Sequence, residues 1–174
     1  KRTPWYLDWF LLRKLHSLLG LFPFGAFVVF HLLINSSVLG SAENYDFAAS
    51  AIERIPLVIL KLMELFMIFL PIIFHGFLGV IIALQSEVNT NQYNYLRNHL
   101  YVFQRVTAWI LVATLTYHIT MTWGMKLAGE VHVINTAFVA NHLSKPMNQL
   151  IYMIFLLAAA YHLAYGLWNF ACKW

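Results

Sequence analysis

Four histidines interrupt long apolar runs of this sequence. They stand in FVVFHLLIN (His31), PIIFHGFLG (His75), TLTYHITMT (His118) and AAAYHLAYG (His162). An ionisable side chain at bilayer depth is costly and usually marks a function. Imidazole is a common metal and haem-iron ligand, whereas a single histidine can also serve only to hydrogen-bond neighbouring helices. The recurrence in four separate runs favours the ligand role.

The elements that must position these histidines are membrane helices. Of the 174 residues, 61% are hydrophobic and 10% are charged, with a mean hydropathy of +0.67, a composition typical of membrane proteins. Each histidine run lacks charged residues for long enough to cross a hydrocarbon core, which takes about 20 residues. We predict an all-α integral membrane fold: an up-down transmembrane helix bundle in one domain, residues 1–174, with spans at about 13–40, 57–86, 100–126 and 146–172.

Several other classes of protein are disfavoured. The sequence pI near 9.3 does not indicate nucleic-acid binding, because the positive charges lie at the ends of apolar runs and form no patch. Cys172 is the only cysteine, which excludes an intrachain disulfide, a CxxCH haem attachment and an iron–sulfur cluster. The first apolar run is longer than a signal-peptide core and is expected to be a retained span.

The distribution of Lys and Arg predicts the orientation. Seven positive residues fall on the side of the N-terminus and four on the other side, so the positive-inside rule places both ends of the four-span bundle in the cytoplasm. The seven are Lys1, Arg2, Arg13, Lys14, Arg97, Arg105 and Lys173; the four are Arg54, Lys61, Lys126 and Lys145.

Helix rise converts sequence position into depth, and the histidines then sort into two pairs. At 1.5 Å per residue, His31 and His118 lie roughly 24–25 Å from the cytoplasmic ends of their spans. His75 and His162, on spans that run the other way, lie roughly 15 Å from theirs. Two imidazoles at each of two depths are what two metals with two axial ligands each require.

The neighbours of these histidines favour a flat macrocycle over a bare metal ion. Ala158 and Gly166 lie one turn from His162, and Gly79 lies one turn beyond His75, so a porphyrin can approach the backbone there. Near His118, Thr114 or Thr122 is expected to accept a hydrogen bond from the second ring nitrogen. Two histidines per iron leave no open position, which indicates electron transfer by a b-type haem. Structural zinc is disfavoured because it takes four ligands.

The remaining four histidines are weaker candidates for metal ligands. His16 and His99 lie at predicted cytoplasmic helix ends, and His132 and His142 lie in the outer connection. An interfacial role is the favoured interpretation for all four.

Six fragments in order then resemble a known family. They are LLRKLHSLLG, FHLLIN, IFLPIIFHGFLG, NQYNYLRN, FQRVTAW and YHLAYGLWNF. Together they resemble the di-haem cytochrome b membrane anchor of succinate:menaquinone oxidoreductases and fumarate reductases, of the single-anchor type found in Gram-positive bacteria. The resemblance spans nearly the whole chain.

The resemblance implies a function and a set of partners. A flavoprotein with covalent FAD oxidises succinate, an iron–sulfur subunit relays electrons, and the anchor passes them through two haem b groups to menaquinone. The anchor is thus the membrane subunit of an enzyme without being its succinate-oxidising part, in a bacterial cytoplasmic membrane with a cytoplasmic N-terminus. The resemblance pairs His75 with His162 for the inner haem and His31 with His118 for the outer haem, as the depth estimate does.

The sequence departs from the family in two ways. Members usually have five membrane helices, whereas four are expected here. Related fumarate reductases that move protons through the membrane carry a glutamate on the fourth haem-bearing span, and LLAAAYH, residues 156–162, contains no acid.

Further site residues are expected at the two membrane faces. At the cytoplasmic face, charge-assisted hydrogen bonds can hold propionates of the inner haem. The candidates are Arg13, Lys14, His16, Ser17 and Arg105. The alternative is that these side chains anchor the chain to lipid headgroups. On the outer side, Glu53 is the acid best placed to supply protons to the quinone, with a solvated loop charge as the alternative. Lys61 and Glu64 are expected to form a structural pair.

Two other classes of function remain open. A di-haem cytochrome b of another quinone-linked enzyme, such as a hydrogenase or formate dehydrogenase, would share the histidine pairs. A non-redox assembly subunit, whose histidines only join helices, would be colourless.

Overall fold

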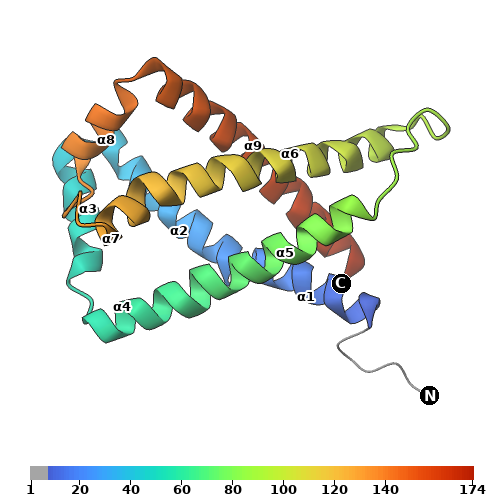
Figure 1. Cartoon of the computed structure of the whole chain (residues 1–174), viewed down its shortest axis with the longest axis horizontal. Helices are drawn as coiled ribbons and strands as arrows, with labels where there is room; N and C mark the ends of the chain where they lie inside the picture. Colours follow the sequence, from blue (N-terminus) through green and yellow to red (C-terminus); the bar gives the residue numbers. More distant parts are fainter. Residues whose placement is uncertain (1–7) are drawn as a thin grey trace.

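All regular elements in residues 8–174, the part of the chain described by the computed structural model, are helices (Figure 1). The α-helices are α1 (Trp9–Leu21), α2 (Phe24–Ser36), α3 (Ala42–Glu53), α4 (Leu57–Met63), α5 (Leu70–Leu84), α6 (Leu96–Ile119), α7 (Met125–Leu127), α8 (Thr136–Leu143) and α9 (Pro146–Lys173). A 3₁₀ turn, η2 (Ser37–Leu39), follows α2, and two π-helical turns, η3 (Glu64–Phe69) and η4 (Thr120–Gly124), precede α5 and α7. The predicted all-α fold is confirmed.

Four long helical rods make up the body of the molecule. Within residues 8–174, three rods are long and apolar enough to cross a membrane: Trp9–Leu39, Leu57–Leu84 and Pro146–Lys173. The fourth runs from α6 through η4 to α7 and is more polar, because α6 contains charged and amide side chains such as Arg97, Gln104 and Arg105. It corresponds to the predicted span 100–126, and its crossing of the membrane remains a prediction. Lys1 and Arg2, which were counted in predicting the orientation, lie outside the described residues.

Prolines interrupt two of the rods. The predicted span 13–40 is divided at Phe22 and Pro23, between α1 and α2, because proline has no N–H and its ring crowds the preceding turn. Pro71 is the second residue of α5, and the widened π-helical turn η3 lies directly before that helix.

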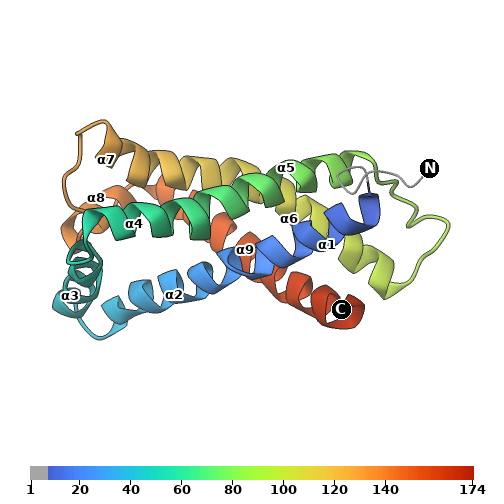
Figure 2. The same ribbon diagram turned by 90° about the horizontal axis from the view of Figure 1, so that it is seen from below.

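Short helices cover one end of the bundle. In both views α3 and α8 lie at that end, whereas α1 begins and α9 finishes at the opposite end, beside the connection 85–95 (Figures 1 and 2). Asp46 on α3 accepts hydrogen bonds from the backbone N–H and the hydroxyl of Thr136, both at 2.8 Å, and so fixes the start of α8. Asn135 caps α8 by accepting from the N–H of Phe138 at 3.0 Å. We call α3 and α8 the capping helices.

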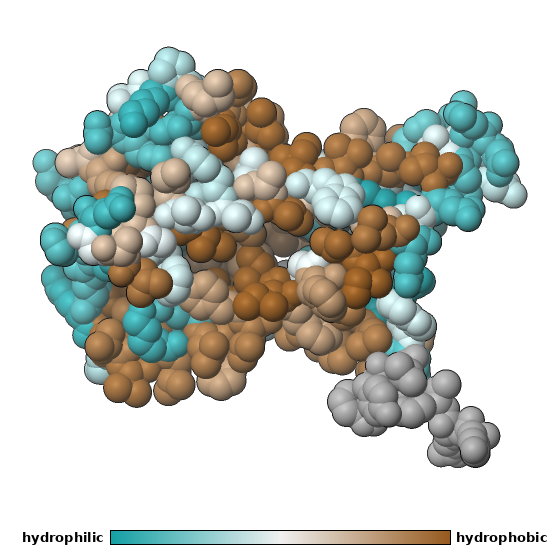
Figure 3. Space-filling view, in the orientation of Figure 1, coloured by the Kyte–Doolittle hydropathy of each residue, from teal (hydrophilic) through white to brown (hydrophobic). Residues whose placement is uncertain are grey.

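Few residues are buried inside the bundle, and its outer surface is apolar. The buried apolar residues are Tyr45, Leu78, Ala158 and Tyr165, and in the described range no side chain is less than 2% exposed. Large apolar side chains such as Val58 and Leu157 point outward, being 72% and 68% exposed. They form a band between the hydrophilic ends of the molecule (Figure 3). This distribution suits a surface in contact with hydrocarbon.

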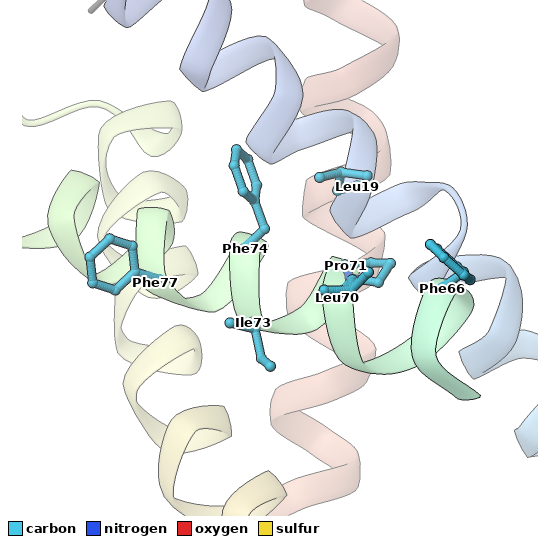
Figure 4. A pocket seen from close by; sticks show the side chains of 7 residues that line it. All are labelled: Leu19, Phe66, Leu70, Pro71, Ile73, Phe74 and Phe77. Carbon is cyan, nitrogen blue, oxygen red and sulfur yellow. The ribbon is translucent and has the colours of Figure 1, made fainter. Parts of the chain in front are cut away.

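An apolar groove of about 490 Å³ follows the outside of the bundle between α1 and η3–α5 (Figure 4). All its lining side chains are apolar: Leu19, Phe66, Leu70, Pro71, Ile73, Phe74 and Phe77. A groove of this composition on a membrane-facing surface suits lipid chains.

Candidate functional site

The four intramembrane histidines meet as two pairs, each joining two different rods. His75 on α5 and His162 on α9 form the inner pair, with ring centroids 6.2 Å apart and ring planes at 88°. His31 on α2 and His118 on α6 form the outer pair, with centroids 5.9 Å apart and planes at 68°. The inner pair lies toward the start of α1, and the outer pair lies toward the capping helices.

The spacing of both pairs fits one metal between two axial imidazoles. A metal–imidazole bond is about 2 Å long and the ring centroid lies about 1 Å behind the nitrogen, so two collinear ligands have centroids about 6 Å apart. Within residues 8–174 no cluster brings together three or more metal-ligating side chains. Two imidazoles at this spacing are the donors that an electron-transfer haem with two histidine ligands would need, and both pairs fit such a group.

The backbone of α1 holds the first inner histidine. Nδ1 of His75 donates a hydrogen bond to the carbonyl oxygen of His16 at 2.8 Å. This bond places the ring hydrogen on Nδ1 and leaves Nε2 free to bind a metal. Gly20 permits the approach, because a Cβ at that position would lie 2.3 Å from Nδ1 and Cε1 of His75.

His16 itself lies against the inner pair. Its ring stacks on that of His75, with centroids 4.0 Å apart and planes at 8°. Its Nδ1 donates to the carbonyl oxygen of His75 at 3.0 Å, so the two residues exchange hydrogen bonds. The interfacial interpretation of His16 is wrong, because α1 crosses α5 at this point and brings His16 against His75. The sequence alone does not show this crossing.

Helix α6 supports the second inner histidine. The hydroxyl of Thr107 lies 3.4 Å from Nδ1 of His162 and donates its own hydrogen to backbone carbonyls of α6. Its lone pair is therefore available to accept the Nδ1 hydrogen of His162. The amide Nε2 of Gln104 donates to the carbonyl oxygen of His162 at 3.1 Å. Sequence reasoning missed Thr107 and Gln104, which lie on another helix.

Arg105 has an unused donor in the same region of α6. Its Nη1 is buried without a hydrogen-bond partner among the described residues, while Nη2 donates to the hydroxyl of Tyr101. The guanidinium carbon lies 3.8 Å from the centroid of the Tyr101 ring. An unpaired buried guanidinium N–H fits a carboxylate ligand, as expected of a group that holds a haem propionate.

The other predicted propionate ligands lie on α1. Arg13 is exposed and lines a shallow pocket with Trp9, Phe10 and Gln85. Lys14 is already engaged: its ammonium donates to the carbonyl oxygen of Lys173 and lies 4.4 Å from the centroid of a Trp174 ring. Ser17 is half-buried.

A tyrosine contacts the second nitrogen of the outer ligand His118. Nδ1 of His118 lies 3.2 Å from the hydroxyl of Tyr152 on α9. The expected partners Thr114 and Thr122 instead donate to the carbonyl oxygens of Ile110 and His118, at 2.8 and 2.7 Å. The threonine prediction is wrong because the Tyr152 hydroxyl, which reaches across from α9, is what lies beside Nδ1 of His118.

Four side chains around this contact form what we call the outer aromatic cluster: Tyr117, Phe138, His142 and Tyr152. The ring centroid of His142 lies 6.0, 6.1 and 5.6 Å from those of the other three, in that order. Asn148 ties the cluster together, because it accepts from the Tyr117 hydroxyl at 2.8 Å and donates to the carbonyl oxygen of His142 at 2.7 Å.

The acidic candidates form ion pairs near the capped end. The Glu53 carboxylate, at the end of α3, lies 3.3 Å from the ammonium of Lys126, with both side chains 46% exposed. Lys61 and Glu64 form the expected pair at 2.7 Å. His132 is exposed in the outer connection. Near the start of α6, Nε2 of His99 donates to Oδ1 of Asn94 at 2.7 Å.

Comparisons with known proteins agree on one family. The model of the succinate dehydrogenase/fumarate reductase transmembrane subunit matches residues 88–171, which contain His118 and His162. The succinate dehydrogenase cytochrome b558 subunit of Bacillus subtilis (strain 168) is 37% identical over 166 residues, which cover 95% of this chain and 80% of that protein. No solved structure matches the chain.

Proposed function

Because the chain belongs to the family of succinate dehydrogenase/fumarate reductase transmembrane subunits, we propose that it carries electrons between the iron–sulfur subunit of such a complex and menaquinone. The relative's name identifies that protein as a cytochrome b, and we extend haem binding to this chain. Membership makes this chain a multi-pass membrane subunit of an oxidoreductase complex. Succinate oxidation, with covalent FAD, belongs in this proposal to the flavoprotein partner.

One observation carries the proposal: two histidine pairs, each spaced for axial ligation of one metal, join the four rods. Bound haem supplies one-electron redox chemistry at each pair. The chain's own task is to hold the imidazoles. Hydrogen bonds donated by Nδ1 of His75, His118 and His162 orient the rings, and such contacts tune both ligand basicity and metal affinity.

The proposed direction of transfer follows from the orientation predicted by charge. The partner subunits lie on the cytoplasmic side near the inner pair, and menaquinone reacts near the outer pair. Electrons that cross outward to menaquinone draw on the membrane potential, which contributes about 2.3 kcal/mol per charge per 100 mV. Fumarate reduction uses the same path in reverse.

Residues at the two faces have supporting roles in this proposal. Arg105, with its unpaired buried Nη1, holds a propionate of the inner haem, together with Arg13, His16 and Ser17. Glu53 supplies protons on the outer side. Its exposure and its pairing with Lys126 are equally compatible with a solvated surface charge.

The test is to purify the complex and measure haem per chain by pyridine haemochrome, with a succinate-reduced minus oxidised spectrum of the same sample. Two b haems per chain, at least one of them reduced by succinate, are expected. A colourless chain would show that no haem is bound and that the histidines only join the helices. Two haems that succinate does not reduce would indicate another quinone-linked enzyme, such as a hydrogenase or formate dehydrogenase.

A further inference from the structure

Helices α1 and α5 cross so that a histidine of each helix fits against a glycine of the other. A Cβ at Gly20 would clash with the ring of His75, and a Cβ at Gly79 would lie only 3.1 Å from Cε1 of His16. Each histidine also donates from Nδ1 to the backbone carbonyl oxygen of the other. His16 and His75 thus occupy equivalent places on the two helices, although only His75 belongs to a pair spaced for axial ligation of one metal.

Contacts with His16 restrain the His75 ring in two directions. The hydrogen bond from Nδ1 of His75 to the carbonyl oxygen of His16, 2.8 Å long, fixes one edge of the ring. The His16 ring covers one face, with centroids 4.0 Å apart and planes at 8°, which is close to van der Waals contact. Rotation of the His75 ring about its Cβ–Cγ bond would therefore break the hydrogen bond or push the ring into that of His16.

His16 is itself held firmly by α5. Its Nδ1 donates to the carbonyl oxygen of His75 at 3.0 Å, and its Cε1 lies against Gly79. Within residues 8–174 no three metal-ligating side chains come together, so His16 is not placed as a third ligand. It is placed as a fixed surface against which the ligand His75 rests.

The outer ligands lack a neighbour of this kind among the described residues. The ring closest to His31 is that of Phe27, one turn away on the same helix, with centroids 5.5 Å apart and planes at 26°. The ring closest to His118 is that of Phe155, at 5.5 Å and 39°. Neither phenyl ring can donate a hydrogen bond. The stack on the inner ligand is closer and more nearly parallel than either of these contacts.

The angle between two axial imidazole planes controls the electronic state of a haem iron. In an oxidised low-spin haem, perpendicular planes leave two iron d orbitals nearly equal in energy, and electron paramagnetic resonance then shows one very large g value. Rotation toward parallel planes separates the orbitals and lowers that g value. The planes of His75 and His162 meet at 88°. Contacts that orient axial ligands are among the means by which a protein tunes a haem.

We propose that His16 is a positioning residue of the inner haem, which holds the ring plane of His75 nearly perpendicular to that of His162. The proposal rests on the proposed function, because it needs a haem at the inner pair. It deepens that function by assigning the ligand geometry of this haem to a histidine that does not bind the iron. The role uses Nδ1 and the face of the His16 ring, whereas a propionate contact would have to use Nε2.

The experiment is electron paramagnetic resonance of the oxidised, purified complex, in which the inner signal is the one that His75→Ala abolishes. His16→Ala removes both the stacked ring and the donor. We expect the largest g value of the inner haem to fall, because any rotation away from 88° lowers it, while the outer signal and two haems per chain remain.

Two further variants separate the two contacts. His16→Phe keeps a flat ring without the donor, and His16→Asn keeps a donor near the place of Nδ1 without the ring. Each should shift the inner signal less than His16→Ala does. His99→Ala is the matched control, because this histidine bonds to Asn94 near the start of α6, and it should leave both signals unchanged.

Three results would overturn the proposal. One is an unchanged inner signal in His16→Ala. Another is an equal shift of both haem signals, which would indicate a general loosening of the bundle. The third is loss of the inner haem from all three His16 variants, which would make His16 necessary for binding the haem rather than for orienting its ligand.

Failure of the proposed function is a separate outcome. The spectrum of the oxidised complex requires neither succinate nor a quinone. If succinate fails to reduce the wild-type haems, the proposed electron path fails, and the spectra of the His16 variants still test the positioning role.

Discussion

The inner and outer histidine pairs are nearly equal in spacing but are held in different ways. Around the inner pair, His75 bonds to the backbone of α1, and His16 returns a bond to the backbone of α5. Around the outer pair, His118 meets a side-chain hydroxyl within a cluster of rings. The inner pair therefore depends on the close approach of two helices, whereas the outer pair depends on individual side chains.

This difference predicts how each pair responds to mutation. A carbonyl partner cannot be removed by substitution, so the inner pair should be most sensitive to added bulk between α1 and α5. A hydroxyl partner is removed by Tyr→Phe, so the outer pair should respond to the loss of single polar atoms. Three experiments test the comparison, from the largest expected effect to the smallest.

Removal of a ligand should eliminate one haem and leave the other. We expect His75→Ala and His162→Ala to abolish the same haem, and His31→Ala and His118→Ala to abolish the other, because each iron needs both imidazoles. Haem per chain should fall from two to one by pyridine haemochrome, with electron paramagnetic resonance identifying which signal is lost. Loss of the same signal in His75→Ala and His118→Ala would show that the pairs are assigned incorrectly.

A larger side chain at the crossing of α1 and α5 should disturb the geometry of the inner histidine pair and leave the outer pair unchanged. The added Cβ in Gly20→Ala would lie 2.3 Å from the His75 ring, and His75 cannot move without weakening its bond to His16 and its alignment with His162. We expect overpacking of about 1–3 kcal/mol, measured as partial loss of the inner haem and earlier thermal bleaching of its absorbance.

Gly76→Ala is the matched control for this substitution. It adds the same methyl group one residue after His75, and apart from its neighbours in the same helix no atom of the described chain lies within 4 Å of the new position. Its haem content should equal that of the unmodified protein. Equal damage in both variants would mean that the close approach of Gly20 to His75 is not what limits the inner site.

Loss of one hydroxyl should weaken the outer pair more than the inner one. Tyr152→Phe removes the 3.2 Å contact with Nδ1 of His118, whereas Thr107→Val removes a longer one, 3.4 Å, from Nδ1 of His162. Partners of this kind typically change metal affinity 10–100-fold, so we expect about tenfold weaker outer haem retention in Tyr152→Phe and less at the inner site in Thr107→Val.

The weaker haem retention expected in these two variants is measured for each haem separately, by its midpoint potential and by its loss on dilution. Tyr161→Phe is the control, because its hydroxyl donates to the carbonyl oxygen of Leu100 at 2.8 Å rather than to a histidine. An effect of Thr107→Val larger than that of Tyr152→Phe would reverse the comparison between the two regions.

Local patterns predicted the rods but not the capping helices. Long charge-free runs identify the rods, because a backbone in hydrocarbon must satisfy its own hydrogen bonds. By contrast, α3 and α8 have mixed compositions that resemble loops, and they are defined by caps such as Ser41 and Asn135 and by the contact between Asp46 and Thr136. Contacts between residues so distant in the chain leave no local pattern to read.

The sequence by itself determined the all-helical membrane class and the family, and it predicted from estimated depth how the four histidines pair. It could do so because apolar length reports a span and helix rise is constant. Only the tertiary structure decided that His16 stacks on His75, that Tyr152 rather than a threonine meets His118, and that Nε2 of His142 is buried. These contacts depend on the rotation of each helix about its axis and on where helices cross, and both are settled by packing among all the rods together.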